Sequence, residues 1–200
     1  VDRVIFDLLV NSASHAALRG MTDLLVVLLS KSDEAVEDLV RRRVFAPAET
    51  LGKDEKNYFE MICSHPEADV RDMASMIFVF VLNRLLQIGG AKNLQAVDQA
   101  ITALLDLMPN ECQKHFEKLG AYFGTLLDLA QSDVAILHIL VRKNTVARLV
   151  DLLCKYNPLY AAAHPPFEKL VLTISFLVRS IPCVVDLGDP YNFWGDDAAQ

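Results

Sequence analysis

The stretch 64–88 constrains the fold of this chain more than any other. Ser64 can cap a helix, Pro66 suits its first turn, and Glu67 suits the positive end of the helix dipole. A long apolar run follows and stops at Gly89. Because apolar residues occupy nearly the whole circumference of this helix, neighbours must cover it on more than one side. The stretch therefore predicts a central, buried helix.

Similar helix signals recur along the rest of the chain. Apolar residues repeat at helical spacing between short runs of Ser, Asn, Pro and Gly. Ser132 and Asn144 are expected N-caps, and Pro109 and Pro182 are expected to end the helices before them. No segment alternates convincingly as a strand would. The pattern predicts about nine or ten helices, over residues 4–9, 14–29, 32–44, 58–62, 64–88, 93–108, 110–130, 132–141, 144–153 and 165–181.

The short connections between these helices predict an all-α fold with antiparallel neighbours. Hydrophobic residues make up 52% of the chain, which is enough for a sizeable core. Helix pairs recur at roughly forty residues, the length of HEAT and armadillo repeats. We therefore expect residues 1–182 to form a single domain of stacked antiparallel helix pairs, either a HEAT/armadillo-like solenoid or an irregular helical bundle.

Residues 66–71 look like the turn and second-helix start of a HEAT repeat. Pro66 would open the helix and Val70 would enter the core. Asp69 and Arg71 could then bridge adjacent units, which makes them candidate structural or interaction residues.

Residues 183–200 are expected to form an irregular acidic and aromatic tail. Tyr191, Phe193 and Trp194 stand there among several aspartates. These aromatic side chains either pack back onto the helices or contact a partner, and all three are candidate interaction residues. We favour packing back, because an isolated exposed Trp is unusual.

The charge balance narrows the range of partners. The chain has 19 Lys and Arg against 26 Asp and Glu, a formal net charge of -7, so nucleic-acid or anionic-membrane surfaces would repel it. We expect neither nucleic acid nor membrane as a partner, and the apolar runs are shorter than the ~20 residues of a membrane span. Four widely spaced cysteines and the lack of a signal peptide predict the reducing cytoplasm.

No residue pattern indicates catalysis. Cys112 and His115 lie one helical turn apart and could share a metal ion, but zinc needs three or four ligands and no second pair lies near in the sequence. A phosphate-binding glycine loop, a metalloprotease helix motif and a nucleophile elbow are all missing from the sequence. We expect no catalytic, cofactor-binding or metal-binding residues, and therefore no enzyme activity in this chain itself.

The order of several segments points to a family. Ala68-Asp69-Val70-Arg71 begins a helix that ends near Leu85, and residues 112–127, residues 167–179 and Asp189-Pro190 follow. This order resembles the helical region that follows the catalytic domain in the very large ubiquitin-specific proteases of the fat-facets type.

The resemblance implies a noncatalytic scaffold or protein-interaction segment of a large cysteine-type deubiquitinase, a ubiquitin carboxyl-terminal hydrolase. Its partners would be proteins, such as the protease domain of the same chain or proteins of the ubiquitin pathway. The Cys and His boxes of that family are absent from these residues, so no catalytic position carries over. Val1 begins inside an amphipathic pattern, which favours a segment of a longer protein.

Two other functions remain open from the sequence. One is a HEAT/armadillo-type adaptor domain of an unrelated trafficking or regulatory complex. The sequence upstream of Val1 would distinguish this adaptor from the deubiquitinase segment. A Cys box there would favour the protease, and further helical repeats would favour the adaptor. The other is a metal-dependent or small-molecule helical enzyme, which depends only on Cys112 and His115.

Overall fold

The computed structural model describes residues 15–41, 44–45, 58–63, 65–114, 116–155 and 164–187. Every regular element in these residues is helical, so the predicted all-α class is confirmed. The expected helix at residues 4–9 lies outside the described ranges. The elements are α2 (His15–Lys31), α3 (Asp33–Arg41), α4 (Tyr58–Cys63), α5 (Ala68–Ile88), α6 (Ala91–Lys114), the 3-10 turn η2 (Phe116–Lys118), α7 (Gly120–Ser132), α8 (Val134–Arg142), α9 (Thr145–Lys155) and α11 (Pro166–Leu187).

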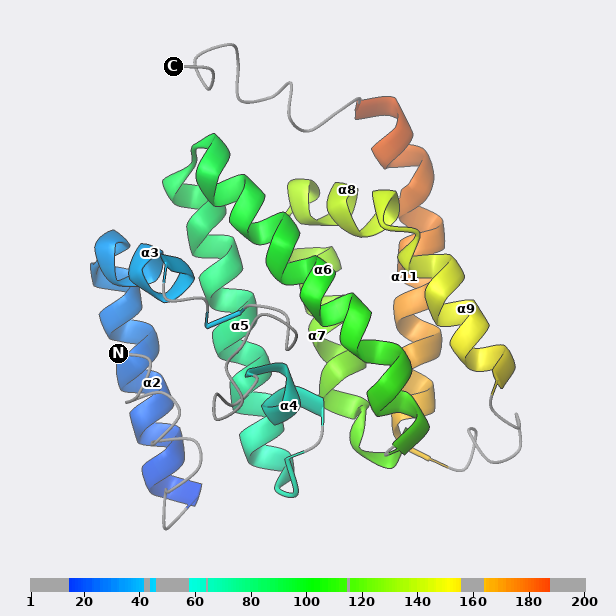
Figure 1. The fold of residues 1–200 in the computed structure, drawn as a ribbon, viewed down its shortest axis with the longest axis horizontal. Helices are drawn as coiled ribbons and strands as arrows, with labels where there is room; N and C mark the ends of the chain where they lie inside the picture. The colour runs from blue at the N-terminus through cyan, green and yellow to red at the C-terminus, as the bar shows by residue number, and fades with distance from the viewer. Residues whose placement is uncertain are drawn as a thin grey trace.

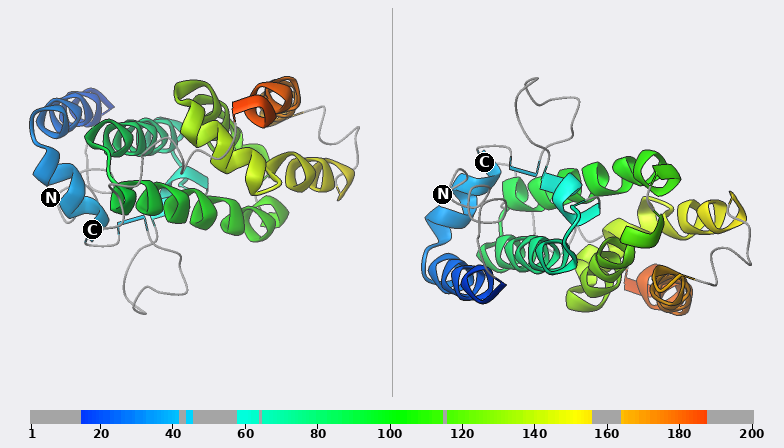
Figure 2. Two further views of the ribbon diagram at one scale, coloured as in Figure 1. Left: turned by 90° about the horizontal axis from the view of Figure 1, so that it is seen from above. Right: turned by 90° about the horizontal axis from the view of Figure 1, so that it is seen from below.

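The helices form two layers. The first is a row in which α2 packs against α5, α5 against α7, and α7 against α11 (Figure 1). These helices run in the same direction, whereas α6 returns antiparallel to α5. Figure 2 shows α3, α6 and α9 in the second layer. Helix α8 crosses between the layers, contacting α7 and α11 in one and α6 and α9 in the other.

Helix α5 is the central element that the sequence predicts. It packs against α2, α3, α4, α6 and α7, and its buried residues lie on most of its circumference. They are Val70, Met73, Ala74, Ser75, Ile77, Phe78, Val81, Leu82, Leu85 and Leu86. Such a helix is covered on both sides within the row and also from the second layer, as its composition requires.

A cluster of four aromatic rings joins the short helix α4 to α5. Phe78 of α5 meets Phe45 and Phe59 edge to face, with ring centroids 5.1 and 5.4 Å away. Tyr58 meets Phe45 in the same way at 4.9 Å. Its hydroxyl donates to the carbonyl of Ala74 at 2.8 Å, so the only polar atom of this ring finds a partner inside the core.

The start of α5 differs from the prediction. The helix begins at Ala68, and Pro66 lies in the bend before it rather than in the first turn. The His65 ring accepts from the amide of Glu67 at 3.2 Å, and Arg71 donates to the carbonyls of His65 and Pro66 at 2.6 and 3.0 Å. These bonds stabilise a turn where we expected helix. The predicted cap, Ser64, lies outside the described residues.

Pro109 and Pro182 do not end their helices, so both predictions were wrong. Helix α6 continues to Lys114, and α11 continues to Leu187 with Pro182 inside it. A proline deprives a helix of one hydrogen bond but does not prevent packing on either side of it. Residues 183–187 therefore belong to α11 and not to an irregular tail, while residues 188–200 lie outside the described ranges.

The turn between α7 and α8 is capped one residue later than expected. Asp133 accepts from the amide of Ala135 at 2.7 Å, whereas Ser132 is the last residue of α7.

Asn144 precedes α9 with a positive φ of 55°, a conformation that Asn tolerates better than most residues. Among the described helices, none combines the length and apolar character that crossing a bilayer requires.

Candidate interaction site

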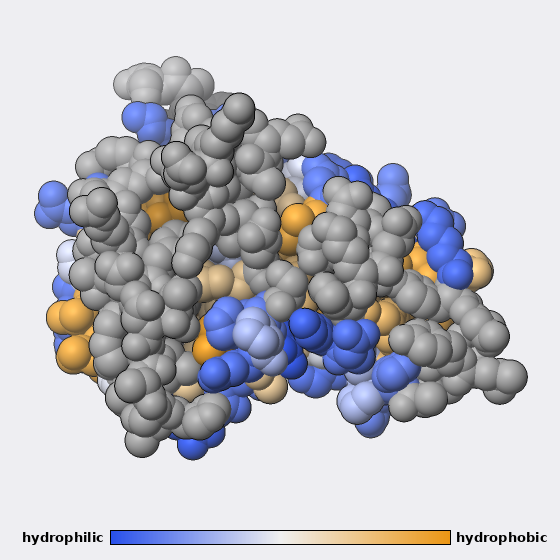
Figure 3. Space-filling view, turned by 60° about the horizontal axis from the view of Figure 1, so that its bottom comes forward, coloured by the Kyte–Doolittle hydropathy of each residue, from blue (hydrophilic) through white to orange (hydrophobic). Residues whose placement is uncertain are grey.

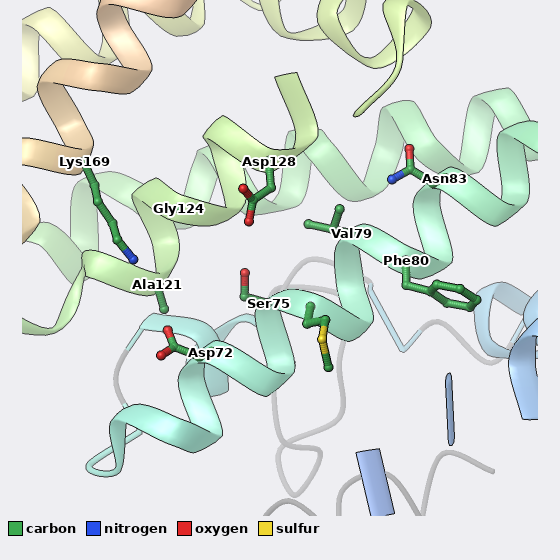
Figure 4. Close-up of a pocket in the computed structure, with 10 residues that line it drawn as sticks. Asp72, Ser75, Val79, Phe80, Asn83, Ala121, Gly124, Asp128 and Lys169 are labelled. Atoms are coloured by element: carbon green, nitrogen blue, oxygen red, sulfur yellow. The ribbon is translucent and has the colours of Figure 1, made fainter. Parts of the chain in front are cut away.

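An open cavity of about 490 Å³ lies between α5, α7 and α11 (Figure 4). One wall comes from α5 and consists of Asp72, Ser75, Met76, Val79, Phe80 and Asn83. The opposite wall consists of Ala121, Gly124 and Asp128 of α7, and Lys169 of α11 closes one end. The volume falls within the range of about 300–1,000 Å³ that is typical of ligand pockets.

Helical spacing places these residues together. Those of α5 recur every three or four positions, and so do those of α7, so each set occupies a single helix face. Gly124 leaves room for Lys169, because a Cβ there would lie in van der Waals contact with its side chain, 3.4 Å from the Nζ atom. Lys169 extends from α11 across α7 at this position.

Ser75 of the cavity wall belongs to a buried hydroxyl pair with Thr125 of α7. Ser75 Oγ and Thr125 Oγ1 are 2.6 Å apart, and Thr125 Oγ1 also lies 2.8 Å from the carbonyl oxygen of Ala121. A hydroxyl has one proton to donate. Both bonds form only if Thr125 donates to Ala121 and Ser75 donates to Thr125. The pair joins α5 to α7 beside the cavity.

Three charged side chains also line the cavity. Figure 4 shows Ser75 and Asp128 facing each other, with Lys169 reaching toward Asp72 and Phe80 pointing away from the charged end. Partial desolvation raises the pKa of Asp128, and the Lys169 ammonium opposes that shift to a smaller extent. Within the described part of the chain, no hydrogen bond or ion pair engages the side chains of Asp72, Asp128 or Lys169.

The residues predicted from the sequence lie elsewhere. Asp69 is exposed in the first turn of α5, and both described hydrogen bonds of Arg71 go to the turn before its own helix. Arg71 therefore has a local structural role, while a role for Asp69 and Arg71 between adjacent units stays a prediction. Tyr191, Phe193 and Trp194 lie outside the described residues.

Other ion pairs, which the sequence analysis missed, join the helix pairs. Arg84 of α5 contacts Asp33 of α3 at 2.6 Å. Asp98 of α6 contacts Arg142 and Lys143 at 3.1 and 3.0 Å, and Asp106 of α6 contacts Arg148 of α9 at 2.8 Å. The two aspartates lie about two turns apart on one face of α6. That spacing is a signal in the sequence, but their partners became evident only from the packing.

Exposed apolar residues lie at both ends of the first layer. Leu24, Val27 and Leu28 of α2 are 59%, 52% and 56% exposed and recur at helical spacing, while Thr22, Leu25 and Leu29 of the same helix are buried. In Figure 3 a hydrophobic group lies at the left edge, the side of α2. At the other end, α11 exposes Val171, Leu172 and Val178.

In the part of the chain that the structure describes, no three His, Cys, Asp or Glu side chains come together as a metal ion would need. The side chains of Cys112 and His115, the pair considered for a metal, fall outside that part. Cys63 is buried, Cys154 and Cys183 are exposed, and none of these three described cysteines forms a disulfide. Comparison with protein-family models, curated proteins and solved structures finds no match for this chain.

Proposed function

We propose that this chain is a noncatalytic α-helical scaffold that binds other proteins. The apolar stripe of α2 carries the proposal. Its three members lie three or four positions apart or side by side, within little more than one turn of the helix, and each is more than half exposed. Single exposed apolar side chains are ordinary on a protein surface, but a contiguous group is typical of an interaction site. The row of helices holds this stripe rigidly, since α2 packs on α5 through its opposite face.

The proposal extends to a parent protein. The order of segments described in the sequence supports a scaffold segment of a large cysteine-type deubiquitinase, working in the cytoplasm. Its partners would then be the protease domain of the same chain or proteins of the ubiquitin pathway. A ubiquitin vinyl sulfone probe should leave this chain unlabelled. Covalent labelling of any of its cysteines would contradict the noncatalytic role.

Substitution of the stripe tests the binding role. We expect Leu24→Ser combined with Leu28→Ser to remove the proteins that cross-link to the purified chain in a cytosolic extract. Both positions are exposed, so Tm should change little. Val134→Ser is the matched control, because Val134 is 52% exposed on α8, away from the stripe. An unchanged set of cross-linked proteins in the double variant would overturn the proposal.

A further inference from the structure

We infer that the cavity between α5, α7 and α11 is a subsite for a basic side chain, Lys or Arg, that a partner protein presents beside an apolar residue. This inference rests on the proposed function, because it names the chemistry of a partner that a scaffold would hold. The cavity differs from the stripe on α2 in one respect. Ionisable side chains from three helices face the same open space here without hydrogen-bonded partners in the described residues.

The charges favour a cation as the occupant. Asp72 and Asp128 contribute two carboxylates, and Lys169 contributes a single ammonium. The excess is negative, and the net charge of -7 for the whole chain has the same sign. A guanidinium or ammonium group between the two carboxylates would restore the balance and form charge-assisted hydrogen bonds. An anionic group would instead be repelled by both carboxylates.

The Asp128 carboxyl adds a second electrostatic reason. The walls of the cavity desolvate it and raise its pKa, and Lys169 only partly compensates. A carboxylate in this condition gains more from an incoming cation than one that is fully hydrated. Lys169 itself would compete with that cation, because it approaches the same carboxylates from α11.

The uncharged part of the wall indicates what else the partner presents. Met76 is 47% exposed, and Val79 follows on the same face of α5. Basic side chains carry an aliphatic stem that packs on such a surface while the charged end remains among polar groups. A protein segment with Arg or Lys near a Leu-like residue would fill both parts, whereas a free metal ion would leave the apolar wall uncovered.

The cavity is pre-organised for this purpose. The Ser75–Thr125 hydroxyl pair holds α5 against α7. Thr173 Oγ1 of α11 lies 3.1 Å from the carbonyl oxygen of Phe123 in α7 and 2.7 Å from that of Lys169 in its own helix, so the two carbonyls share its single proton. The three helices are thus held together by buried hydrogen bonds beside the charged groups. Little ordering is needed on binding, which limits the entropic cost.

Matched peptides test the inference. The probe is a fluorescein-labelled, alanine-based helical peptide with Arg and Leu four positions apart, and its control has Glu in place of Arg. Fluorescence anisotropy with the complete chain should show that the Arg peptide binds at least about tenfold more tightly than the Glu peptide. Equal affinities for the two peptides, or no binding of the Arg peptide up to about 1 mM, would reject the subsite.

Two variants locate the site, because removing the carboxylates and removing the ammonium should change the affinity in opposite directions. Asp72→Asn combined with Asp128→Asn should weaken binding of the Arg peptide about tenfold, and Lys169→Gln should strengthen it several-fold. All three positions are exposed, so folding should persist, and circular dichroism checks this. Weaker binding of the double variant could also come from unfolding, but unfolding cannot strengthen binding. The Lys169→Gln variant therefore separates an effect on the site from an effect on folding. Unchanged or weakened binding by Lys169→Gln would contradict the proposed role of the carboxylates.

The Leu24→Ser and Leu28→Ser variant separates this inference from the proposed function. It should retain the affinity for the Arg peptide while losing its partners in the extract. If the peptide instead loses affinity in this variant, the basic segment binds α2 and the cavity assignment is wrong. If the peptide discriminates as expected but the extract partners persist, the stripe hypothesis fails and the subsite stands.

Discussion

Buried hydroxyl groups join four pairs of neighbouring helices around α5 and α7. Thr22 of α2 donates to the Met73 sulfur of α5 at 3.3 Å, and Tyr58 of α4 donates to α5. Ser75 joins α5 to α7, and Thr173 joins α11 to α7. Apolar contacts alone leave the sliding of one helix along another weakly determined, whereas a buried donor must meet its acceptor. These hydroxyls therefore fix the relative position of the row.

The Ser75–Thr125 pair predicts an asymmetric mutational effect. Thr125→Val leaves the Ser75 proton buried without an acceptor in that pair and should destabilise the chain by about 1–3 kcal/mol. Ser75→Ala should cost only about 1 kcal/mol, because Thr125 keeps its bond to Ala121. Urea unfolding of both single variants and the double variant gives the coupling. A double variant as unstable as the sum of the singles would show that the pair does not interact.

Tyr58 predicts a loss of stability at alkaline pH. Burial raises the pKa of Tyr58 far above its ordinary value of 10.0, so the folded state keeps a proton that the unfolded state releases. Stability from this group is complete below about pH 10 and falls above it, by up to about 1.4 kcal/mol per pH unit. The free energy of unfolding measured from pH 8 to 11 should show this slope. Tyr58→Phe should lessen it, and an equal slope in that variant would rule out Tyr58 as the cause.

At the scale of the element, prolines show how packing overrides local preference. From the sequence, Pro109 and Pro182 are predicted to end their helices, because each lacks an amide donor. In the structure α6 and α11 continue through them. On α11 the apolar faces on both sides of Pro182 pack better as one helix, since Leu177 and Val184 are both buried. One lost hydrogen bond costs less than the contacts that a broken helix would lose.

Pro182→Ala tests this explanation. The substitution restores an amide donor in an exposed position of α11 and removes a ring that disturbs the preceding turn. We expect a gain of about 1–3 kcal/mol in the free energy of unfolding, because proline is about 3 kcal/mol less favourable than alanine inside a helix. Arg179→Ala on the same helix is the control and should change stability by about 0.5 kcal/mol at most. A lower Tm for Pro182→Ala would indicate that α11 requires its proline.

At the scale of the whole molecule, α5 connects both layers. Its aromatic contacts reach α4, and its neighbours in the row reach α2 on one side and α7 on the other. Repeat arrays can unfold unit by unit, whereas a domain with a shared core unfolds in one step. The contiguous set of buried residues from Leu25 to Val184 favours the single step.

Phe78→Ala distinguishes these two behaviours. Phe78 is fully buried in the aromatic cluster, so its truncation should cost about 3–5 kcal/mol. We expect the amide NMR signals of α2 and α11 to disappear together in urea, at a lower concentration than in the unmodified chain. If α11 stays folded while α2 unfolds, the molecule behaves as separate stacked units.

The sequence by itself determined the all-α class, the central position of α5 and most helix positions from α2 to α9. Those features depend on periodicity and caps, which are local properties of the chain. Only the tertiary structure decided that two helices continue through proline and that Arg71 binds its own turn. It also decided that Asp72, Asp128 and Lys169 share a cavity. The cavity and the continuous helices depend on contacts between residues far apart in the sequence, and such contacts arise only when the helices pack. The Arg71 bonds are local, but they depend on the conformation of the turn at His65 and Pro66, which residue patterns do not specify.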